Sequence, residues 1–315
     1  MSLSRSLAVA IGALLCAVCL ALLYLTGIVA WGVVGLSQPS SSEIVLGVQR
    51  ELYENLRPVW QADPQCARFD AALIYVPREG DCAFKAIEFD TRLHFDANGR
   101  LGTSAPGASG RPIAVLGDSH AMGWGVKDEE TFAARLSAKL ARPVLNLAVS
   151  SYGTDRELRR WLATPAARDA DTIVIQYCEN DIAENRARLR REPADAKAVY
   201  AQITAHHEAG LRERVALIGR LYKAAFHATR FAFYRAVGHR VRAEEPLVFG
   251  GHYDALIGVL RDVPELASRR VIVFYANGHG RAFSGFPRGR DATLPNVEFV
   301  DLEMSPGDFY RLDDH

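Results

Sequence analysis

The sequence predicts an α/β protein with a parallel, doubly wound sheet, attached to a membrane by one N-terminal helix. Three observations predict this fold class. A long apolar stretch without charges begins near the N-terminus, short apolar runs alternate with helical patterns from Pro112 onward, and polar motifs follow several of those runs. Alternation of strand and helix predicts a parallel sheet, because parallel neighbours need a crossover connection.

The apolar stretch carries no charged side chain from Ser6 to Ser42. Its part from Leu7 to Val34 exceeds the roughly 20 helical residues that cross a bilayer core. A cleavable signal has an apolar region of only about 7–15 residues, so we expect an uncleaved signal anchor. Arg5 before the span and Glu43 as the first charge after it favour an extracytoplasmic main domain, periplasmic in a Gram-negative cell.

The five cysteines agree with an oxidising compartment. Cys16 and Cys19 lie inside the span, and Cys178 lies in a predicted buried strand. Cys66 and Cys82 have polar neighbours and lie beyond the span, so we expect them to form a disulfide. The alternative is two unrelated free thiols.

Composition changes along the chain predict three regions. Residues 1–42 form the anchor and a short linker, and 43–111 a small, mostly β extension that ends in a loop rich in Gly, Ser and Pro. Residues 112–315 form the main domain. Lysine plus arginine equals aspartate plus glutamate, 37 each, so charge gives no argument for a nucleic-acid partner.

Five apolar runs in the main domain predict buried strands: Ile113–Leu116, Val144–Val149, Thr172–Tyr177, Val271–Tyr275 and Val297–Val300. After the second run, Thr154 and Glu157 have the spacing of a capping box that starts a helix. The stretch 182–242 is too long for an ordinary connection. Its helix-forming composition, basic and aromatic in the second half, predicts a helical insertion that caps the active site.

Polar motifs follow these strands at the edge where open α/β sheets bind ligands. Gly117-Asp118-Ser119-His120 follows the first strand, Gly153 the second and Asn180 the third. Asp313-Asp314-His315 follows the fifth. Each motif alone is also typical of a turn, a helix cap or an acidic tail. Together they predict a nucleophile, oxyanion donors, and a base with its carboxylate.

The four blocks, with the phrase from Val115 to Val126, resemble the SGNH or GDSL-type hydrolases, in particular their bacterial membrane-associated branch. The resemblance covers Pro112 to the C-terminus, and the segment with Cys66 and Cys82 resembles the region before that core. It implies a flavodoxin-like, three-layer fold with a five-stranded parallel sheet. It also implies carboxyl-ester or acyl-transfer chemistry without a metal or other cofactor.

Carried over residue by residue, the resemblance makes Ser119 the nucleophile and His315 the base. Ser119, Gly153 and Asn180 supply the oxyanion hole. Many members place the aspartate three residues before the histidine, where this chain has Leu312, so Asp313 is the better partner and Asp314 the poorer one. Members usually continue into a closing helix, so we expect the natural chain to be longer. His279 is a competing base.

The expected substrate is an acylated carbohydrate or a small ester, and the tethered location favours acetyl groups on an envelope polysaccharide. Hydrolase and transferase share this constellation of residues, so both stay open. Two other functions are alternatives: a non-catalytic carbohydrate-binding module on the same fold, and a lipid esterase whose basic and aromatic insertion touches the membrane.

Overall fold

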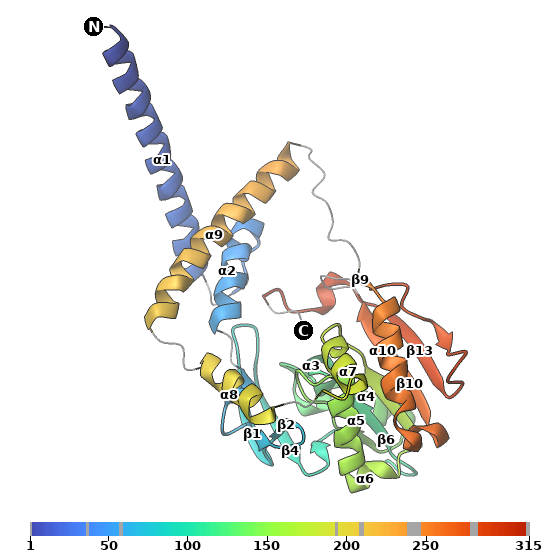
Figure 1. Ribbon diagram of the computed structural model, residues 1–315. Coiled ribbons are helices and arrows are strands. Elements are labelled where there is room, and N and C mark those ends of the chain that lie inside the picture. Colours follow the sequence, from blue (N-terminus) through green and yellow to red (C-terminus); the bar gives the residue numbers. More distant parts are fainter. Residues whose placement is uncertain are drawn as a thin grey trace. The chain divides into compact units, whose positions relative to one another are not determined.

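The computed structural model describes residues 2–35, 38–56, 59–192, 195–207, 211–237, 247–277 and 283–312. The chain divides into two compact units (Figure 1). The helical unit comprises Met1–Arg57, Ala209–Ala243 and Arg311–Asp313, and the sheet unit comprises Pro58–Glu208, Glu244–Tyr310 and Asp314–His315.

The helical unit consists of α1 (Ser2–Val34), α2 (Glu43–Leu56) and α9 (Leu211–Ala236). α1 contains the stretch Val9–Val34, which is long and apolar enough to cross a membrane by length and composition. Residues 43–56 belong to the predicted mostly β extension, yet they form a helix. The reason lies in the spacing of Ile44, Val48 and Leu52, which places these side chains on one helical face toward α1 and α9.

In the described part of the chain, the sheet unit is built on one mostly parallel sheet of nine strands, rather than the five that the sequence predicts. Its order is β12-β13-β10-β8-β6-β7-β5-β4-β3. The five predicted runs form its parallel part: β6 (Ile113–Leu116), β7 (Val144–Asn146), β8 (Thr172–Gln176), β10 (Arg270–Asn277) and β13 (Val297–Glu303). If these five strands are numbered 1 to 5 in chain order, they lie side by side in the sheet in the order 2-1-3-4-5, one of the two common doubly wound arrangements.

The remaining four strands explain the difference in number, because three of them come from the predicted extension. They are antiparallel and comprise β3 (Gly80–Lys85), β4 (Asp90–Asp96), β5 (Gly99–Arg100) and β12 (Gly289–Arg290). β5 pairs with β7 through Arg100 and Asn146. Three of the five strands that the structure describes in the extension therefore belong to the main sheet, and β1 and β2 pair with each other.

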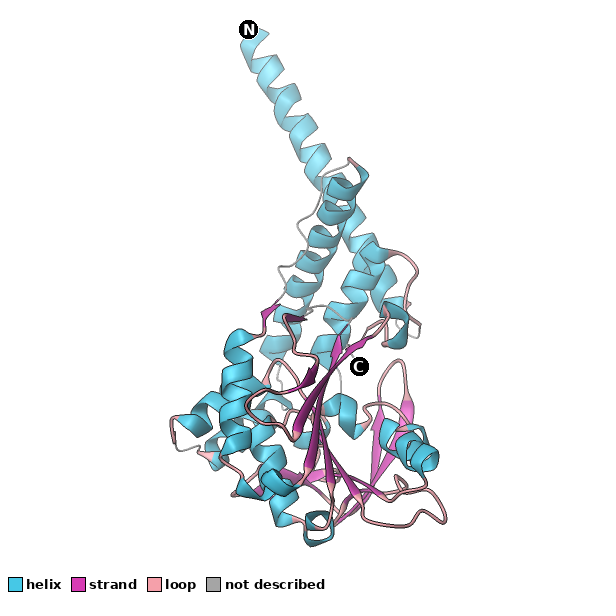
Figure 2. Cartoon of the chain, turned by 90° about the vertical axis from the view of Figure 1, so that its right-hand side faces the viewer, coloured by secondary structure: helices cyan, strands magenta, loops and turns pink. Residues whose placement is uncertain are grey.

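Alternating side chains of the parallel strands enter two cores, one on each face of the sheet. Ala114 and Leu116 of β6 face the core formed with α5 (Thr154–Ala163) and α10 (Gly250–Arg261), whereas Ile113 and Val115 face the core formed with α4 (Phe132–Leu140). Figure 2 shows the sheet between its helices. The second core also takes in β1 (Ala67–Asp70), β2 (Ile74–Pro77), β3 and β4.

The predicted insertion 182–242 is not one structural unit. α7 (Asp181–Leu189) packs on α10 and α5, and α8 (Ala196–His207) packs on β1 and β2, both within the sheet unit. α9, which holds most of the basic and aromatic residues, packs on α1 and α2 in the helical unit.

The predicted disulfide is present: Cys66 and Cys82 are bonded, with their Cα atoms 4.9 Å apart. It connects the chain entering β1 to β3, and both cysteines are buried.

We expect the double variant Cys66→Ala, Cys82→Ala to lose about 3 kcal/mol of unfolding free energy, because the bridge closes a loop of about 15 residues in the unfolded chain. Urea denaturation measures this loss. Cys178→Ala, which removes a free thiol, is the control and should change stability less. Mass spectrometry that finds Cys66 and Cys82 unmodified thiols in the oxidised protein would contradict the assignment.

Candidate active site

The predicted nucleophile lies at a sharp turn between a buried strand and a short helix. All four residues of β6 are buried, and α3 (Ser119–Met122) starts three residues after the strand ends. Gly117 makes the turn with φ of 146°, and a Cβ atom there would lie 2.7 Å from Ala121 Cβ and 2.8 Å from Gln176 Cβ. Only glycine fits this backbone and this space. Ser119 is therefore held at the carboxyl end of β6.

One carboxylate joins the motifs that follow three different strands. Asp118 Oδ1 accepts hydrogen bonds from the backbone N–H groups of Ser119 (2.6 Å) and Ser151, and its Oδ2 accepts from Asn180 Nδ2 (2.9 Å). Asp118 is only 4% exposed. Because a carboxylate only accepts hydrogen bonds, the atom of Asn180 that faces it must be the NH₂ group, which leaves one of its two N–H donors for another partner.

Two buried polar side chains at strand ends also hold the nucleophile turn, and the sequence analysis did not single them out. Gln176, at the end of β8, accepts hydrogen bonds from the N–H groups of Asp118 (3.1 Å) and Ala121 (3.3 Å). Asn146, at the end of β7, donates to the carbonyl of Ala121 (2.9 Å). The available signal was a polar residue that ends an otherwise apolar run.

Gly153, predicted as an oxyanion donor, lies at the start of α5, and its N–H has a partner. It donates to Glu184 Oε2 at 3.2 Å. Glu184 is in turn held by Arg156, whose Nε donates to Oε2 (2.9 Å) and whose Nη2 donates to Oε1. A Cβ at position 153 would lie 2.9–3.0 Å from Glu184 atoms. Glycine is thus required for the carboxylate to approach the backbone closely.

The predicted capping box at the start of α5 is wrong. Gly153 is the N-cap residue, and the hydroxyl of Thr154 donates to Asp181 Oδ2 (2.8 Å). Glu157 is therefore free of a capping role, and it is buried with neither carboxylate oxygen hydrogen-bonded within the described part of the chain. Burial, reinforced by the nearby Asp181 carboxyl, raises the pKa of Glu157 well above its ordinary value. Burial and Asp118 raise the pKa of Asp181 likewise.

This burial predicts a pH-dependent loss of stability. An acid whose pKa is raised in the folded state keeps its proton there after the unfolded chain has released it, so stability falls as pH rises above about 4.3, the ordinary glutamate pKa. We expect Glu157→Gln to match the wild type below that pH and to be about 1–3 kcal/mol more stable near neutrality. Urea denaturation from pH 4 to pH 8 measures the difference. The exposed acid variant Glu265→Gln is the control, and a Glu157→Gln gain that does not change with pH would contradict the argument.

The described C-terminal segment runs beside the nucleophile helix. The ring of Phe309 packs edge-on against His120, with centroids 6.1 Å apart, and Tyr310 Oη donates to the carbonyl of Gly125 (3.1 Å). The predicted base and its partners, His315, Asp313 and Asp314, and the competing base His279 lie outside the described residues. The structure therefore brings together the blocks of Ser119, Gly153 and Asn180.

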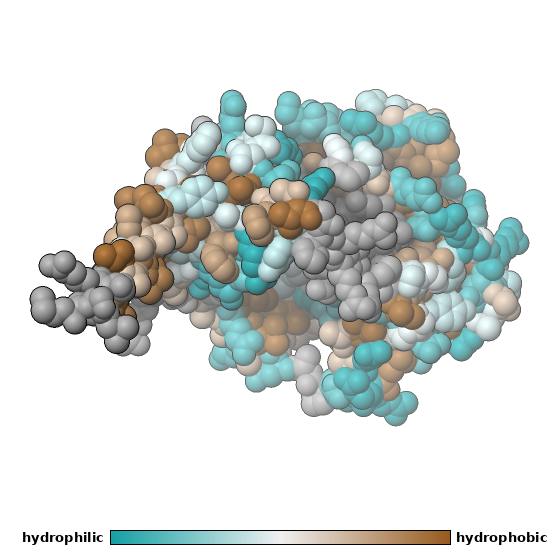
Figure 3. Space-filling view, turned by 90° about the horizontal axis from the view of Figure 1, so that it is seen from above, coloured by the Kyte–Doolittle hydropathy of each residue, from teal (hydrophilic) through white to brown (hydrophobic). Residues whose placement is uncertain are grey.

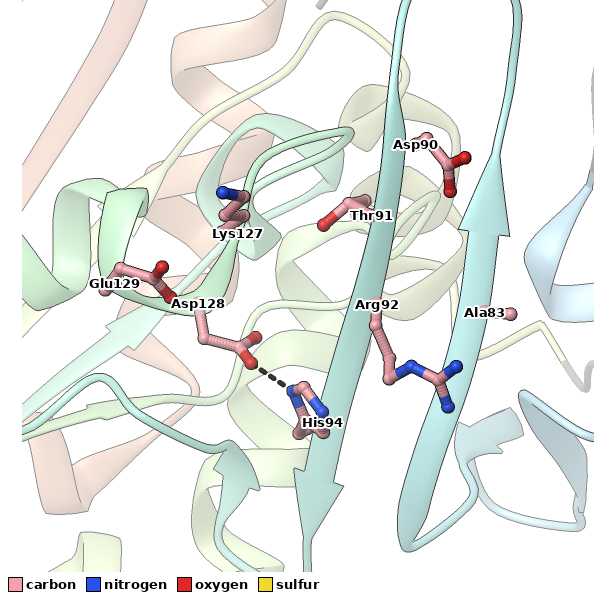
Figure 4. A pocket seen from close by; sticks show the side chains of 8 residues that line it. All are labelled: Ala83, Asp90, Thr91, Arg92, His94, Lys127, Asp128 and Glu129. Carbon is pink, nitrogen blue, oxygen red and sulfur yellow. Dashed lines mark hydrogen bonds and ion pairs between the residues drawn. The ribbon is translucent and has the colours of Figure 1, made fainter.

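A second polar network links the extension to the loop after α3. Arg100 of β5 has a fully buried side chain that donates to Asp128 Oδ1 (2.6 Å) and to the carbonyls of Met122, Gly123 and Val126 (2.6–2.7 Å). The other oxygen of Asp128 bonds to His94 of β4 at the wall of an open pocket of about 340 Å³ (Figure 4). The pocket is lined by β3, β4 and the loop at Lys127–Glu129, and none of the predicted site residues lines it.

Within the described ranges, no group of three or more His, Cys, Asp or Glu side chains is arranged to hold a metal ion. The Asp118 carboxylate accepts hydrogen bonds from N–H donors and Asp181 accepts one from the Thr154 hydroxyl, and burial raises the pKa of Asp181 and Glu157.

Residues 115–249 match the family model described as the GDSL-like Lipase/Acylhydrolase family. The match confirms the predicted resemblance to the SGNH/GDSL hydrolase superfamily and supports an enzyme of the esterase or acylhydrolase class. It includes Ser119, Gly153 and Asn180 and ends before β10. No curated protein sequence matches the chain.

Proposed function

We propose that this chain is a membrane-anchored serine esterase or O-acyltransferase whose catalytic domain lies outside the cytoplasm. The observation that supports this most directly is the Asp118 carboxylate, which gathers Ser119, Ser151 and Asn180 from the ends of three parallel strands. A nucleophile turn and a side-chain amide fixed by one shared acceptor suit an acyl-transfer site, since the amide has a second N–H to offer.

In the proposed reaction, His315 takes the proton of the Ser119 hydroxyl as the oxygen attacks the ester carbonyl. Asp313 orients the imidazole and stabilises its charged form. Collapse of the tetrahedral intermediate breaks the ester bond, and the imidazolium returns its proton to the leaving alcohol. Water or a sugar hydroxyl then attacks the acyl-enzyme by the same steps in reverse, releasing Ser119.

The proposed oxyanion donors are the N–H groups of Ser119 and Gly153 and the side chain of Asn180. Asn180 can serve directly, because Asp118 uses only one of its N–H groups. The other two donors are bonded to carboxylates, Asp118 and Glu184. A substrate carbonyl must therefore take the place of the Glu184 carboxylate at the N–H of Gly153. Catalysis then requires Glu184 to give up this hydrogen bond and to keep only its bonds to Arg156.

The position of the C-terminal segment supports His315 as the base. Phe309 contacts His120, the neighbour of the nucleophile. His315 follows Phe309 by six positions, and an extended chain of that length reaches at most about 20 Å. The base is thus within reach of Ser119 without any rearrangement of the sheet.

An acylated carbohydrate of the cell envelope is the proposed substrate, with an acetyl group as the acyl unit. The disulfide Cys66–Cys82 supports an oxidising compartment, and α1 supports a tether to the membrane. Small acetyl esters are the corresponding test substrates.

Labelling with a fluorophosphonate probe tests the proposal. The purified full chain in detergent should be labelled, and peptide mapping should place the adduct on Ser119, because such probes react with activated serines. The hydrolase and transferase forms are separated by adding a soluble oligosaccharide with an acetyl donor and measuring acetylated sugar against free acetate. An unlabelled protein would favour the non-catalytic carbohydrate-binding module, and an adduct on another serine would overturn the site.

A further inference from the structure

Helix α9 presents an apolar stripe to its surroundings. Phe226, Phe233 and Val237 follow one another at positions i, i+7 and i+11, which lie on one face of a helix, and they are 53%, 61% and 54% exposed. Phe231 and Tyr234 are also exposed beside this stripe. Large aromatic side chains gathered on one exposed helix are unusual for a surface that faces only water.

The opposite face of α9 fixes the helix against α1 and α2. Leu221 and Ala225 are buried in a core with Ile28 of α1, and Tyr222 Oη shares a hydrogen bond with Thr26 Oγ1 at 2.8 Å. Among the described residues of α9, none after Ala225 belongs to this core. The position of α9 along α1 is therefore determined within the helical unit.

The exposure of α1 indicates where a bilayer would end. From Leu7 to Tyr24 every α1 side chain with an assigned exposure is exposed, and partial or full burial starts at Leu25, Ile28 and Gly32, where α2 and α9 cover the helix. The exposed part has 18 positions, or about 27 Å at 1.5 Å per residue, which matches the roughly 30 Å of a hydrocarbon core. Figure 3 shows apolar side chains gathered on α1. α9 crosses α1 just outside this apolar part.

The charges of α9 complement an anionic surface. Lys223, Arg230 and Arg235 are exposed, Arg220 is exposed and paired with Glu51 (3.7 Å), and the sequence 216–237 contains no acidic residue. Cations beside aromatic side chains are the composition of helices that lie in the headgroup layer.

We propose that the second half of α9, residues 226–237, lies in the interface of the same bilayer that α1 crosses. Phe226, Phe233 and Val237 enter the boundary between headgroups and acyl chains, and Arg230 and Arg235 bind anionic headgroups. This inference rests on the proposal that α1 spans the membrane, and it does not depend on the catalytic assignment.

The test uses the full chain in nanodiscs that contain a photoreactive phospholipid, with adducts mapped by mass spectrometry. Adducts on α1 report insertion of the anchor, and peptides of α10, which packs in the core of the sheet unit, serve as the control that lipid does not reach. We expect adducts on 226–237 that fall at least fivefold in Phe226→Ser, Phe233→Ser while adducts on α1 stay unchanged. In phosphatidylglycerol discs, the variant Arg230→Ala, Arg235→Ala should show a similar fall in adducts on 226–237. Its labelling should then differ little between phosphatidylglycerol and phosphatidylcholine discs, because the charges that favour the anionic lipid are gone.

Three results would overturn the inference. In the first, α1 is labelled and 226–237 is not in either lipid, so α9 lies clear of the membrane. In the second, α1 itself is unlabelled, which removes the premise. In the third, a protein cross-linker joins 226–237 of two chains and excludes lipid adducts, so that a second copy covers the stripe. Activity toward acetyl esters is measured on the same samples, so a failure of this inference is distinguishable from a failure of the proposed chemistry.

Discussion

Replacing Ser119 by alanine is expected to lower kcat for a small acetyl ester by about 10⁴–10⁶-fold, because nucleophile and base act as a unit and removing one removes most of their joint effect. The change deletes one oxygen at the first position of α3 and leaves the hydrogen bonds of Asp118, Gln176 and Asn146 to the backbone of the turn in place. Circular dichroism and the melting temperature should therefore stay close to those of the wild type.

Ser151→Ala is the matched control for this variant. Ser151 lies in the same site, but its hydrogen bond to Asp118 comes from the backbone N–H, which alanine retains. Initial rates of acetate release should stay within a fewfold of wild type. Near-normal activity of Ser119→Ala would refute the catalytic assignment, and a large loss in Ser151→Ala alone would point to a different nucleophile.

Asp118→Asn is expected to lower kcat by about 10²–10³-fold, the typical effect of losing one oxyanion donor. An asparagine at 118 can still accept from the N–H groups of Ser119 and Ser151 through its oxygen. Its NH₂ group then faces the NH₂ group of Asn180, and two donors repel each other. Asn180 relieves this by turning its amide over, which points its oxygen at the introduced amide and removes the N–H that the oxyanion needs.

A double variant separates this mechanism from simple destabilisation. In Asp118→Asn, Asn180→Asp the carboxylate at 180 accepts from the amide at 118, so the buried hydrogen bond is restored and unfolding free energy should recover relative to Asp118→Asn. Activity should stay low, because position 180 no longer offers an N–H. The control is Asp155→Asn. It also exchanges a mostly buried acid for its amide, but Asp155 forms ion pairs with Arg159 and Arg188 instead of a bond to Asn180. Recovery of activity in the double variant would contradict the role assigned to Asn180.

The sequence predicted the parallel part of the fold well, because continuous apolar runs such as Ile113–Leu116 have to be buried on both faces of a sheet. The disulfide also followed from local features. The antiparallel strands that complete the sheet were not predicted as part of it, because the pairing of β5 with β7 joins residues 46 positions apart and leaves no local signal. The helix α2 was missed although its apolar spacing was visible, because it follows a linker and precedes a β-rich segment.

At the candidate site, the sequence pattern singled out Ser119, Gly153 and Asn180 in the segments that follow three strands, but not the contacts that hold these segments. Asp118 and Gln176 act through contacts between strand ends that only the folded sheet brings together. Glu184 was missed for a different reason. It lies one turn beyond Asn180 on α7, and nothing in the sequence indicates that Arg156 directs it to the N–H of Gly153.

The antiparallel edge of the sheet has a consequence for where this protein can be divided. The family match begins at residue 115 and so excludes β3, β4 and β5. Cutting there would strip β7 of its neighbour, since the N–H and carbonyl of Val144 bind the hydroxyl of Ser104, and Asn146 pairs with Arg100. A bare strand edge of this kind recruits other chains and aggregates. The smallest part that folds alone therefore has to start before β3, and exchange of this domain between relatives must carry the edge along.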